Sequence, residues 1–285
     1  MVIKTIGILY HPRVTATRLK AEEMAGLLKA QGVTAWICSA WEGEEACRKM
    51  QGTDLLLTVG GDGTILRAVQ AVIPQMTPVT GVNQGKLGFM TELGNDEAVS
   101  KLPALISGEG WNDERAMLRA EVTRKGKTPQ VFHALNDIVM ARGGIARLVR
   151  IDASIDGQPL PTYKADAVIV ATATGSTGYA LAAGGPVLHP HAPEMLMVPV
   201  APHLCPGYPL LIPEKSQIIL WLSTYLESTL SIDGHINIPL TDGDTVAIRR
   251  SPYIARFRRI HPEGSFFTTL EEKLKGKQGV SGRKS

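Results

Sequence analysis

The apolar run Leu55–Val59 and the glycine-rich loop Gly60–Thr64 that follows it constrain the fold more than any other feature of this sequence. A strand that is apolar throughout is expected in a parallel sheet that is covered on both faces. Glycines between such a strand and a helix let backbone amides approach phosphate oxygens, and the helix dipole favours the anion. The two features together predict a phosphate-binding α/β domain.

Asp62 is the unusual residue of the loop Gly60-Gly61-Asp62-Gly63-Thr64. A carboxylate among phosphate-binding amides repels the ligand unless it binds a metal or accepts a proton. The loop is neither a Walker A motif, which ends in Lys-Ser or Lys-Thr, nor the dinucleotide fingerprint G-x-G-x-x-G. A plain tight turn at Asp62-Gly63 explains the same residues, so the loop alone leaves the function open.

The remaining patterns divide the chain into two domains and a tail. Strand and helix patterns alternate over residues 1–112, which predicts a Rossmann-like α/β N-terminal domain with a mostly parallel sheet. Short β-rich runs separated by Asp-Gly turns predict a β-rich, sandwich-like C-terminal domain over 113–254. We expect residues from about 255 to 275, with a helix near Phe266–Leu274, to pack back on the first domain, and 276–285 to be disordered.

Individual elements follow from the same patterns. In the first domain we expect strands at Thr5–Tyr10, Val33–Cys38, Leu55–Val59 and Pro78–Val82, and helices around 19–28, from Thr64 to about Ile73, and from a cap at Asn95 to about Ser107. In the second domain we expect strands at Leu118–Thr123, Val131–Leu135, Leu148–Ile155, Ala167–Ala171, Ile218–Leu222, Leu230–Ile232 and Thr245–Arg249.

Charge and composition exclude several classes of protein. Five of the 30 basic residues lie in the last thirteen positions, so the rest of the chain carries 25 basic against 27 acidic groups. A body so close to neutral does not support nucleic-acid binding. The most apolar stretch, Met195–Ile212, contains four prolines and does not read as a membrane helix. Three scattered cysteines favour reduced thiols in a cytoplasmic protein.

A second group of motifs lies in the β-rich domain. The run Ala171–Pro186 is dominated by small and hydroxylated residues, which offer amides and hydroxyls to a nucleotide, and Tyr179 can stack on a base. Close packing of two layers is the alternative explanation of these small residues. The polar pair Asn136-Asp137 interrupts an apolar run, which a strand-end turn explains equally well. Position alone does not decide whether Asp166 binds a ligand.

Taken together, these motifs resemble the NAD kinase family from Ile6 to about Leu274. The resemblance is carried, in order, by Gly60–Thr64, Gly81-Val82-Asn83, Leu87-Gly88-Phe89, Asn136-Asp137, Thr174-Gly175-Ser176-Thr177, Tyr179 and Gly184-Gly185-Pro186. The glycine-rich loop also occurs in the diacylglycerol and sphingosine kinase group. The segments Thr174–Tyr179 and Leu87-Gly88-Phe89 are the ones that select NAD kinase.

The resemblance implies that ATP, or polyphosphate, phosphorylates the 2′-hydroxyl of the adenosine ribose of NAD. Asp62 is then the catalytic residue, as acceptor or orienter of the hydroxyl proton. The loop residues hold the donor phosphates with a divalent cation, magnesium, for which no protein ligand is assigned. Expected nucleotide-binding residues are Gly61, Gly63, Thr64, Arg67, Asn83, Phe89, Asn136, Asp137, Arg147, Lys164, Asp166, Thr174, Thr177, Gly178, Tyr179, Ala180, Leu181, Ala182, Asp233 and His235.

Some positions depart from the family pattern. Gly178 replaces the usual alanine, His235 the usual glutamine, and Lys164 the usual arginine, which forfeits bidentate contacts. The resemblance also implies a homodimer or homotetramer whose partners are NAD and ATP, with no nucleic acid and no membrane. Two alternatives remain open: a lipid kinase that shares the loop, and a non-catalytic NADP(H) sensor that keeps the fold.

Overall fold

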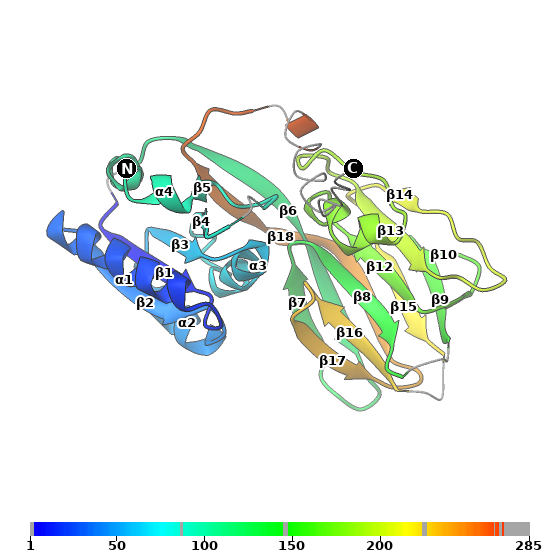
Figure 1. Cartoon of the computed structure of the whole chain (residues 1–285). Helices are drawn as coiled ribbons and strands as arrows, with labels where there is room; N and C mark the ends of the chain where they lie inside the picture. Colours follow the sequence, from blue (N-terminus) through cyan, green and yellow to red (C-terminus); the bar gives the residue numbers. More distant parts are fainter. Residues whose placement is uncertain are drawn as a thin grey trace, which may run out of the picture. The chain divides into compact units, whose positions relative to one another are not determined.

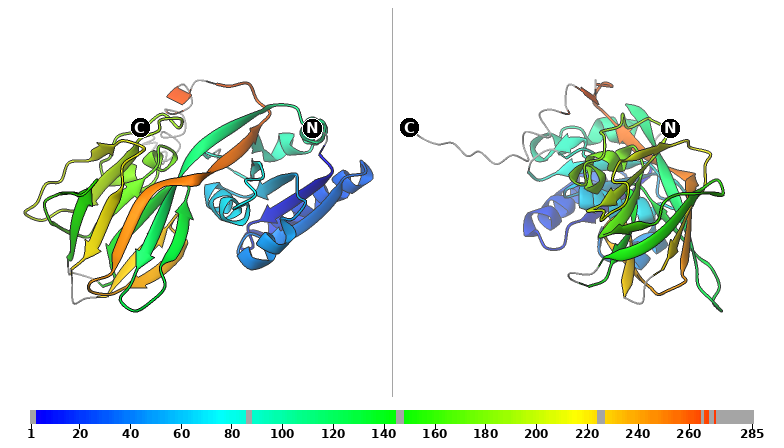
Figure 2. Two further views of the ribbon diagram at one scale, coloured as in Figure 1. Left: turned by 180° about the vertical axis from the view of Figure 1, so that it is seen from behind. Right: turned by 90° about the vertical axis from the view of Figure 1, so that its right-hand side faces the viewer.

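The structure is a computed structural model that describes residues 3–85, 88–144, 148–223, 227–264, 266, 267 and 270. The chain divides into two compact units (Figure 1; Figure 2). Unit 1 comprises Met1–Glu114 with Ala255–Ser285, and unit 2 comprises Arg115–Ile254. Leu87, Arg147 and the tail 276–285, which was predicted to be disordered, lie outside the described residues. Most of the helix predicted near Phe266–Leu274 also lies outside them.

Unit 1 is an α/β structure around a parallel sheet. Its elements are β1 (Thr5–Tyr10), α1 (Thr15–Ala30), β2 (Thr34–Ser39), α2 (Gly43–Lys49), β3 (Leu55–Val59), α3 (Asp62–Ala71), β4 (Val79–Asn83), β5 (Leu93–Gly94), α4 (Asn95–Ala98), α5 (Leu102–Ser107), the start of β6 (Trp111–Thr123) and the end of β18 (Thr245–Arg259). The strand order is β18-β4-β3-β1-β2, with β5 beside β4, and these pairs are parallel.

The central strand β3 is buried along its whole length, as its apolar sequence predicted. On one face Leu55 and Leu57 pack in a cluster with Met24 and Leu28 of α1 and with Leu102 and Leu105 of α5. The helix that follows β3 begins at Asp62, two residues before the predicted start, with Gly61 as its N-cap. The carboxylate of the loop is therefore at the first turn of a helix.

The predicted helix from Asn95 to Ser107 is wrong in two respects. Its cap is Gly94, whose N–H donates to the Glu97 carboxylate at 2.9 Å, and Asn95 is already helical. The helix is also broken into α4 and α5 because Pro103 cannot donate a backbone hydrogen bond. Pro103 is accommodated in the first turn of α5, where no intrahelical donor is required. The short helix α2 was not predicted, since only Ala46 of its seven residues is buried.

Unit 2 is built from two β layers. Its elements are the rest of β6, β7 (Gln130–Ala134), β8 (Asp137–Arg142), β9 (Val149–Ile155), β10 (Gln158–Pro159), β11 (Tyr163–Ala165), β12 (Ala167–Ala171), the 3₁₀ turn η1 (Thr174–Thr177), α6 (Tyr179–Ala182), β13 (Met195–Val200), β14 (Leu210–Ile212), β15 (Ile218–Leu222), β16 (Ser228–Ile232), β17 (Ile236–Leu240) and most of β18. One layer is the antiparallel sheet β14-β13-β12-β8-β16-β17, and the other runs through β9, β15, β18, β6 and β7.

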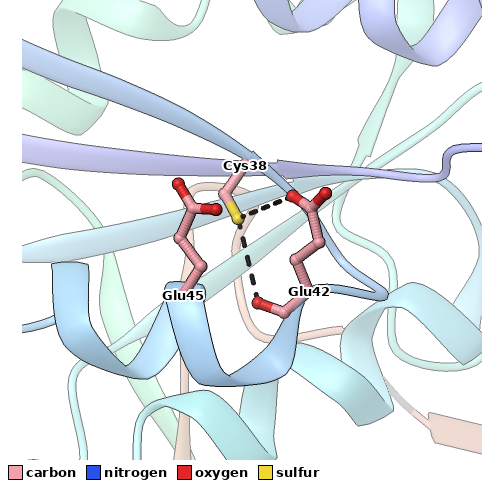
Figure 3. A group of neighbouring side chains, drawn as sticks. All are labelled: Cys38, Glu42 and Glu45. Atoms are coloured by element: carbon pink, nitrogen blue, oxygen red, sulfur yellow. Dashed lines mark hydrogen bonds between the residues drawn. The ribbon is translucent and has the colours of Figure 1, made fainter.

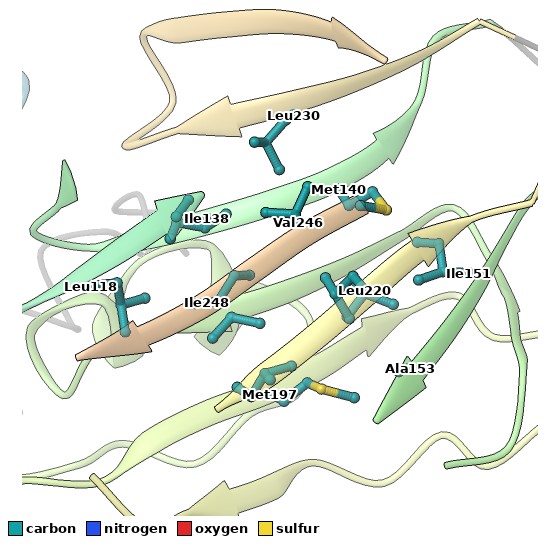
Figure 4. Packing of buried hydrophobic residues seen from close by; sticks show 14 of the residues in the cluster. Leu118, Ile138, Met140, Ile151, Ala153, Met197, Leu220, Leu230, Val246 and Ile248 are labelled. Atoms are coloured by element: carbon teal, nitrogen blue, oxygen red, sulfur yellow. The ribbon is translucent and has the colours of Figure 1, made fainter. Parts of the chain in front are cut away.

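The core of unit 2 lies between these layers (Figure 4). Met140 and Met197 of the antiparallel sheet contribute to the same buried cluster as Leu220, Val246 and Ile248 of the other layer. The opposite face of β12 is covered by α6, since Ala180 clusters with Ile169. The two units together confirm the predicted fold class, an α/β domain with a sandwich-like β domain.

Strand β13 was not predicted, because proline is unfavourable in a strand, and the structure shows how it accommodates one. Pro199 lies inside it, opposite Val168 of β12. The neighbouring strand β14 pairs only with the part of β13 from Met195 to Met197. Pro199 thus occupies a position beyond the end of β14, where its missing N–H interrupts no ladder. No helix in the part of the chain that the structure describes is long and apolar enough to cross a membrane.

Candidate active site

The glycine-rich loop turns the chain from β3 into α3. The Gly60 N–H donates to the Val82 carbonyl at 2.9 Å, and Gly60 has φ +157°. A Cβ at Gly60 would lie 2.3 Å from Thr64 Oγ1, so this position requires glycine. A Cβ at Gly61 or Gly63, in contrast, would meet nothing within 4 Å. The space beside these two glycines is therefore open, and their N–H groups belong to the start of α3, where backbone donors have no acceptor within the helix.

Thr64 lies at the base of this loop. Its Oγ1 is buried and has no hydrogen-bond partner among the described residues. A buried hydroxyl without a partner is costly unless a ligand or water satisfies it. The observation supports the predicted role of Thr64 in ligand binding, and that role remains a prediction.

Asp62 is held by the backbone of a distant segment. Its Oδ2 accepts the Phe89 N–H at 2.9 Å, and its Oδ1 accepts the Met90 N–H at 3.1 Å. Gly88 lies directly against the carboxylate, because a Cβ there would be 2.3 Å from Asp62 Oδ1. These contacts fix the orientation of both oxygens while leaving each oxygen a free lone pair. The motif residues Gly88 and Phe89 thus meet the loop, as a backbone cradle for Asp62.

Arg67 lies on α3, one turn beyond the loop. Its guanidinium stacks over the Trp41 ring at 4.1 Å, and the His11 ring contacts the same indole at 4.5 Å. Burial, together with the nearby charge of Arg13, lowers the pKa of Arg67. Two close cations favour an anionic ligand. The sequence patterns did not identify His11, Arg13 or Trp41, since no local motif links them to the loop.

Asn83 lies at the end of β4, and it is buried. Its Oδ1 accepts the Gly85 N–H at 3.2 Å, which closes the turn after the strand. A contact of Asn83 with a nucleotide remains a prediction.

In unit 2, Asp233 holds the turn that carries Asn136-Asp137. Its carboxylate accepts the N–H groups of Leu135, Asn136 and Asp137 at 2.9, 2.7 and 3.2 Å. The Asp233 N–H donates in return to the Asp137 carbonyl at 3.0 Å, and His235 Nδ1 lies 3.1 Å from the Asp233 carbonyl. Asp233 therefore positions this turn, whatever it binds in addition.

The turn η1 packs on Asn136. A Cβ at Gly175 would lie 2.1 Å from the Asn136 carbonyl, so the two backbones are in direct contact. Asn136 Oδ1 is buried and has no partner among the described residues. The hydroxyls of Thr174 and Thr177 are already engaged, because Thr174 Oγ1 lies 3.4 Å from Arg115 and Thr177 Oγ1 donates to the Thr174 carbonyl at 3.3 Å. Among these side chains, Asn136 is therefore the one whose amide oxygen is available to accept a hydrogen bond from a ligand.

The residues of helix α6 differ in their exposure to solvent. Tyr179 is 46% exposed and free to contact a ring, and Gly178 and Ala182 are also exposed. The Ala180 side chain is fully buried, and Leu181 is half-buried. Any contact of Ala180 with a nucleotide must therefore come from its backbone.

Lys164 and Asp166 lie apart from this cluster. In the β8–β12 ladder, Ala171 is opposite Asp137 and Ala167 is opposite Ala141. Asp166 precedes Ala167 and is five residues, about 17 Å, along the strand from Ala171, the end that leads to η1. It forms an ion pair with Arg142 at 3.1 Å. Within unit 2, the predicted binding residues thus fall into two separate groups.

Asp137 is a buried carboxylate whose pKa is raised to about 7 by burial and by the charge of Asp233. The ordinary pKa of this carboxyl group is 3.8. Between pH 3.8 and about pH 7, Asp137 is therefore protonated in the folded chain but ionised in the unfolded chain. This group therefore stabilises the fold at low pH, and that stabilisation is lost as pH rises from 3.8 to about 7, by up to ~1.4 kcal/mol per pH unit.

Asp137→Asn, which stays neutral, should consequently gain stability relative to the parent chain as pH rises from 5 to 8. Urea unfolding at both pH values measures the difference. An equal difference at pH 5 and pH 8 would contradict the raised pKa.

One cluster of potential metal ligands exists among the described residues, formed by Cys38, Glu42 and Glu45 (Figure 3). Burial, and then the charge of Glu45, raises the pKa of the Cys38 thiol to about 11. The protonated thiol lies 3.6 Å from Glu42 Oε2, and Glu45 pairs with Lys49. The contacts of Cys38 with Glu42, the N-cap of α2, connect the end of β2 to the start of this helix.

Two family models match the chain. The ATP-NAD kinase N-terminal domain matches residues 7–110, and the ATP-NAD kinase C-terminal domain matches residues 135–260. An NAD kinase of Dehalococcoides mccartyi is 46% identical over 274 residues, covering 96% of this chain and 96% of that protein. An NAD kinase of Chloroflexus aurantiacus is 38% identical over 273 residues, covering 96% and 99%.

Solved structures agree with these matches. Yeast NADH kinase complexed with NADH superposes with a TM-score of 0.84 at 28% identity, covering 100% of this chain and 91% of that one. An NAD kinase from Archaeoglobus fulgidus in complex with ATP gives a TM-score of 0.75 at 24% identity, covering 95% and 98%, and supports the fold alone. The two-unit architecture, an α/β unit followed by a β-rich unit, is therefore that of a two-domain kinase. The chain belongs to the NAD kinase family, which confirms the resemblance in its motifs.

Proposed function

We propose that this chain transfers the terminal phosphate of ATP to the 2′-hydroxyl of the adenosine ribose of NAD, producing NADP. The observation that carries the proposal is the position of Asp62: a carboxylate fixed by two amides, in a glycine-rich loop that starts a helix. A helix start attracts phosphate, and a fixed carboxylate attracts the hydroxyl that receives it.

The donor phosphates are assigned to the outer side of the loop. The open amides at Gly61 and Gly63, the partnerless hydroxyl of Thr64 and the cation of Arg67 are the groups that fit phosphate oxygens. A magnesium ion suits this donor set, since Mg²⁺ is commonly held by one or two carboxylates together with substrate phosphates. When bound, it would neutralise charge on the phosphates, and Asp62 is the carboxylate of the loop that could hold it.

Asp62 orients the acceptor hydroxyl and receives its proton. Each of its oxygens accepts one amide N–H and keeps a lone pair for the hydroxyl. The new bond forms between the ribose oxygen and the γ-phosphorus, the bond from that phosphorus to the bridging oxygen of ADP breaks, and the hydroxyl proton passes to Asp62. Because phosphoryl transfer has a loose transition state, the proton can leave late, and positioning matters more than basicity.

The nucleotide of NAD is assigned to unit 2. The buried, partnerless Oδ1 of Asn136 can accept a hydrogen bond from an adenine amino group or a ribose hydroxyl, and Asp137 lies beside it. The exposed ring of Tyr179 can pack on adenine. Two further parts of the proposal rest only on membership of the family. They are the assembly into a homodimer or homotetramer, and contacts of NAD with Arg147, Lys164, Asp166 and His235. A cytoplasmic location is supported by the free thiols of Cys38, Cys47 and Cys205.

The test is formation of NADP by the purified full chain with NAD, ATP and magnesium, read with an NADP-specific dehydrogenase. Parallel reactions contain polyphosphate or other nucleoside triphosphates as donor, and NADH, diacylglycerol or sphingosine as acceptor. We expect NADP, and no lipid phosphate. Phosphorylation of a lipid without NADP would identify a lipid kinase, and tight NADP(H) binding without turnover by any donor would identify a sensor.

A further inference from the structure

The backbone segment Gly88–Glu92 supplies both amides that hold Asp62, so whatever fixes this segment also fixes the carboxylate. Inside the segment, the Gly88 N–H donates to Thr91 Oγ1 at 2.9 Å and closes a turn. At its far end, the Glu92 N–H donates to the Gly81 carbonyl of β4 at 2.9 Å. These contacts shape the turn, but neither of them reaches the peptide groups beside Asp62.

Arg259, the last residue of β18, does reach them. Its Nη1 donates to the Met90 carbonyl at 2.9 Å. The N–H of the same residue, Met90, donates to Asp62 Oδ1 at 3.1 Å. One buried residue therefore connects the guanidinium to the carboxylate through its backbone, with a hydrogen bond on each side.

The guanidinium of Arg259 is itself held rigidly. Its Nε and Nη2 both donate to Asp113 Oδ2, at 3.1 and 3.0 Å, and Nη1 also donates to Glu92 Oε2 at 3.2 Å. The three side chains are 9%, 3% and 8% exposed. Charge-assisted hydrogen bonds are stronger than neutral ones, and salt screens them weakly in a buried site. The position of the guanidinium is consequently well defined.

The chain after Arg259 closes the arrangement. The N–H groups of Ile260 and His261 both donate to Glu92 Oε1 at 2.8 Å. Glu92 thus receives three hydrogen bonds from residues 259–261, and it is also the last residue of the segment that holds Asp62. The end of β18 and this segment form one hydrogen-bonded body.

We propose that Arg259 is a positioning residue for phosphoryl transfer, which acts on Asp62 through the peptide groups of Met90 and touches no substrate. The inference rests on the proposed function, because it assigns Arg259 a role in the step that Asp62 performs. A fixed guanidinium fixes the Met90 carbonyl, and thereby the N–H that aims Asp62 Oδ1. Displacement of a reacting group by about 1 Å can cost 100-fold in rate.

The planar fork of arginine is required for this role. Lysine keeps the charge, but its single ammonium cannot reproduce the two contacts to Asp113 together with the contact to the Met90 carbonyl. Arg259→Lys is therefore the informative variant, because it keeps the charge balance of the buried site and loosens the geometry.

Arg256→Lys is the matched control. Arg256 is on the same strand and pairs with Glu114 at 3.0 Å, but the two side chains are 35% and 54% exposed, and no hydrogen bond among the described residues joins either of them to the segment that holds Asp62. We expect Arg259→Lys to lower kcat by about 10- to 100-fold, with little change in the KM for NAD, and Arg256→Lys to leave both unchanged. Adding Arg259→Lys to Asp62→Asn should lower kcat little further, since a residue that acts through Asp62 has nothing left to position.

Several results would overturn the inference: kcat of Arg259→Lys equal to that of the parent chain, a rise in KM in place of the fall in kcat, or a full additional loss in the Asp62→Asn background. If Arg259→Lys does not fold, Asp113→Asn serves in its place. It keeps the arginine and weakens its anchor, so a smaller fall in kcat in the same direction is expected, and an unchanged kcat would again overturn the inference. Absence of NADP formation by the parent chain would instead refute the proposed function.

Discussion

Asp62→Asn should lower the turnover number by about 10²- to 10⁴-fold, the range that a positioned proton acceptor contributes. The NAD dissociation constant should change little, because asparagine is nearly isosteric and keeps one oxygen to accept an amide. The amide nitrogen of asparagine cannot accept either a proton from the hydroxyl or the second backbone N–H. Initial rates at varied NAD concentration, with NAD binding measured by calorimetry, separate the two effects.

The chain offers a matched control at the other end of β3. Asp54 Oδ2 accepts the N–H groups of Lys4 and Thr5 at 2.8 and 2.9 Å, so it is also a carboxylate that binds two backbone amides. Asp54→Asn should leave turnover unchanged, because Asp54 precedes the strand whereas Asp62 follows it. Equal losses in the two variants would mean that the amide contacts stabilise the unit and that Asp62 has no catalytic role.

Gly88→Ala should lower turnover by about 100-fold through displacement alone. A Cβ at this position would lie 2.3, 2.7 and 2.8 Å from Oδ1, Cγ and Oδ2 of Asp62, which is closer than contacting atoms allow. Either the carboxylate or the segment that holds it must move. The chemical groups of the reaction all remain, so this variant tests their position and not their identity.

Gly85→Ala is the corresponding control in the same connection after β4. A Cβ at Gly85 would meet nothing within 4 Å, and the backbone there does not require glycine. We expect Gly85→Ala to retain the turnover and the melting temperature of the parent chain. If Gly88→Ala is as active as Gly85→Ala, the carboxylate tolerates displacement, and tight positioning of Asp62 does not limit the rate.

Local patterns predicted the elements whose burial is uniform or regular. The strands Thr5–Tyr10, Leu55–Val59 and Ala167–Ala171 occur at the predicted residues. Where the prediction failed, a second factor opposed the local pattern. Pro103 divides the helix predicted from Asn95 to Ser107, and the position of Pro199 beyond the end of β14 allows a strand where proline argued against one.

Motif residues identified the candidate site only in part. The loop Gly60–Thr64 and the pair Asn136-Asp137 were found because their residue types are unusual for a strand end. The groups that position them were not found. Asp233, which holds Asn136-Asp137, was expected to face the nucleotide, and Arg259 was not expected to have a role at all.

The sequence by itself therefore determined that a carboxylate and a phosphate-binding loop meet at the start of a helix, because adjacent residues suffice to specify a strand, a turn and a helix N-terminus. Only the tertiary structure decided how that carboxylate is oriented. The amides that hold Asp62 are 27 and 28 positions away in the chain, and the guanidinium that fixes them is 169 positions beyond Met90. Hydrogen bonds over such separations depend on how the sheet brings its strand ends together, which no local pattern encodes.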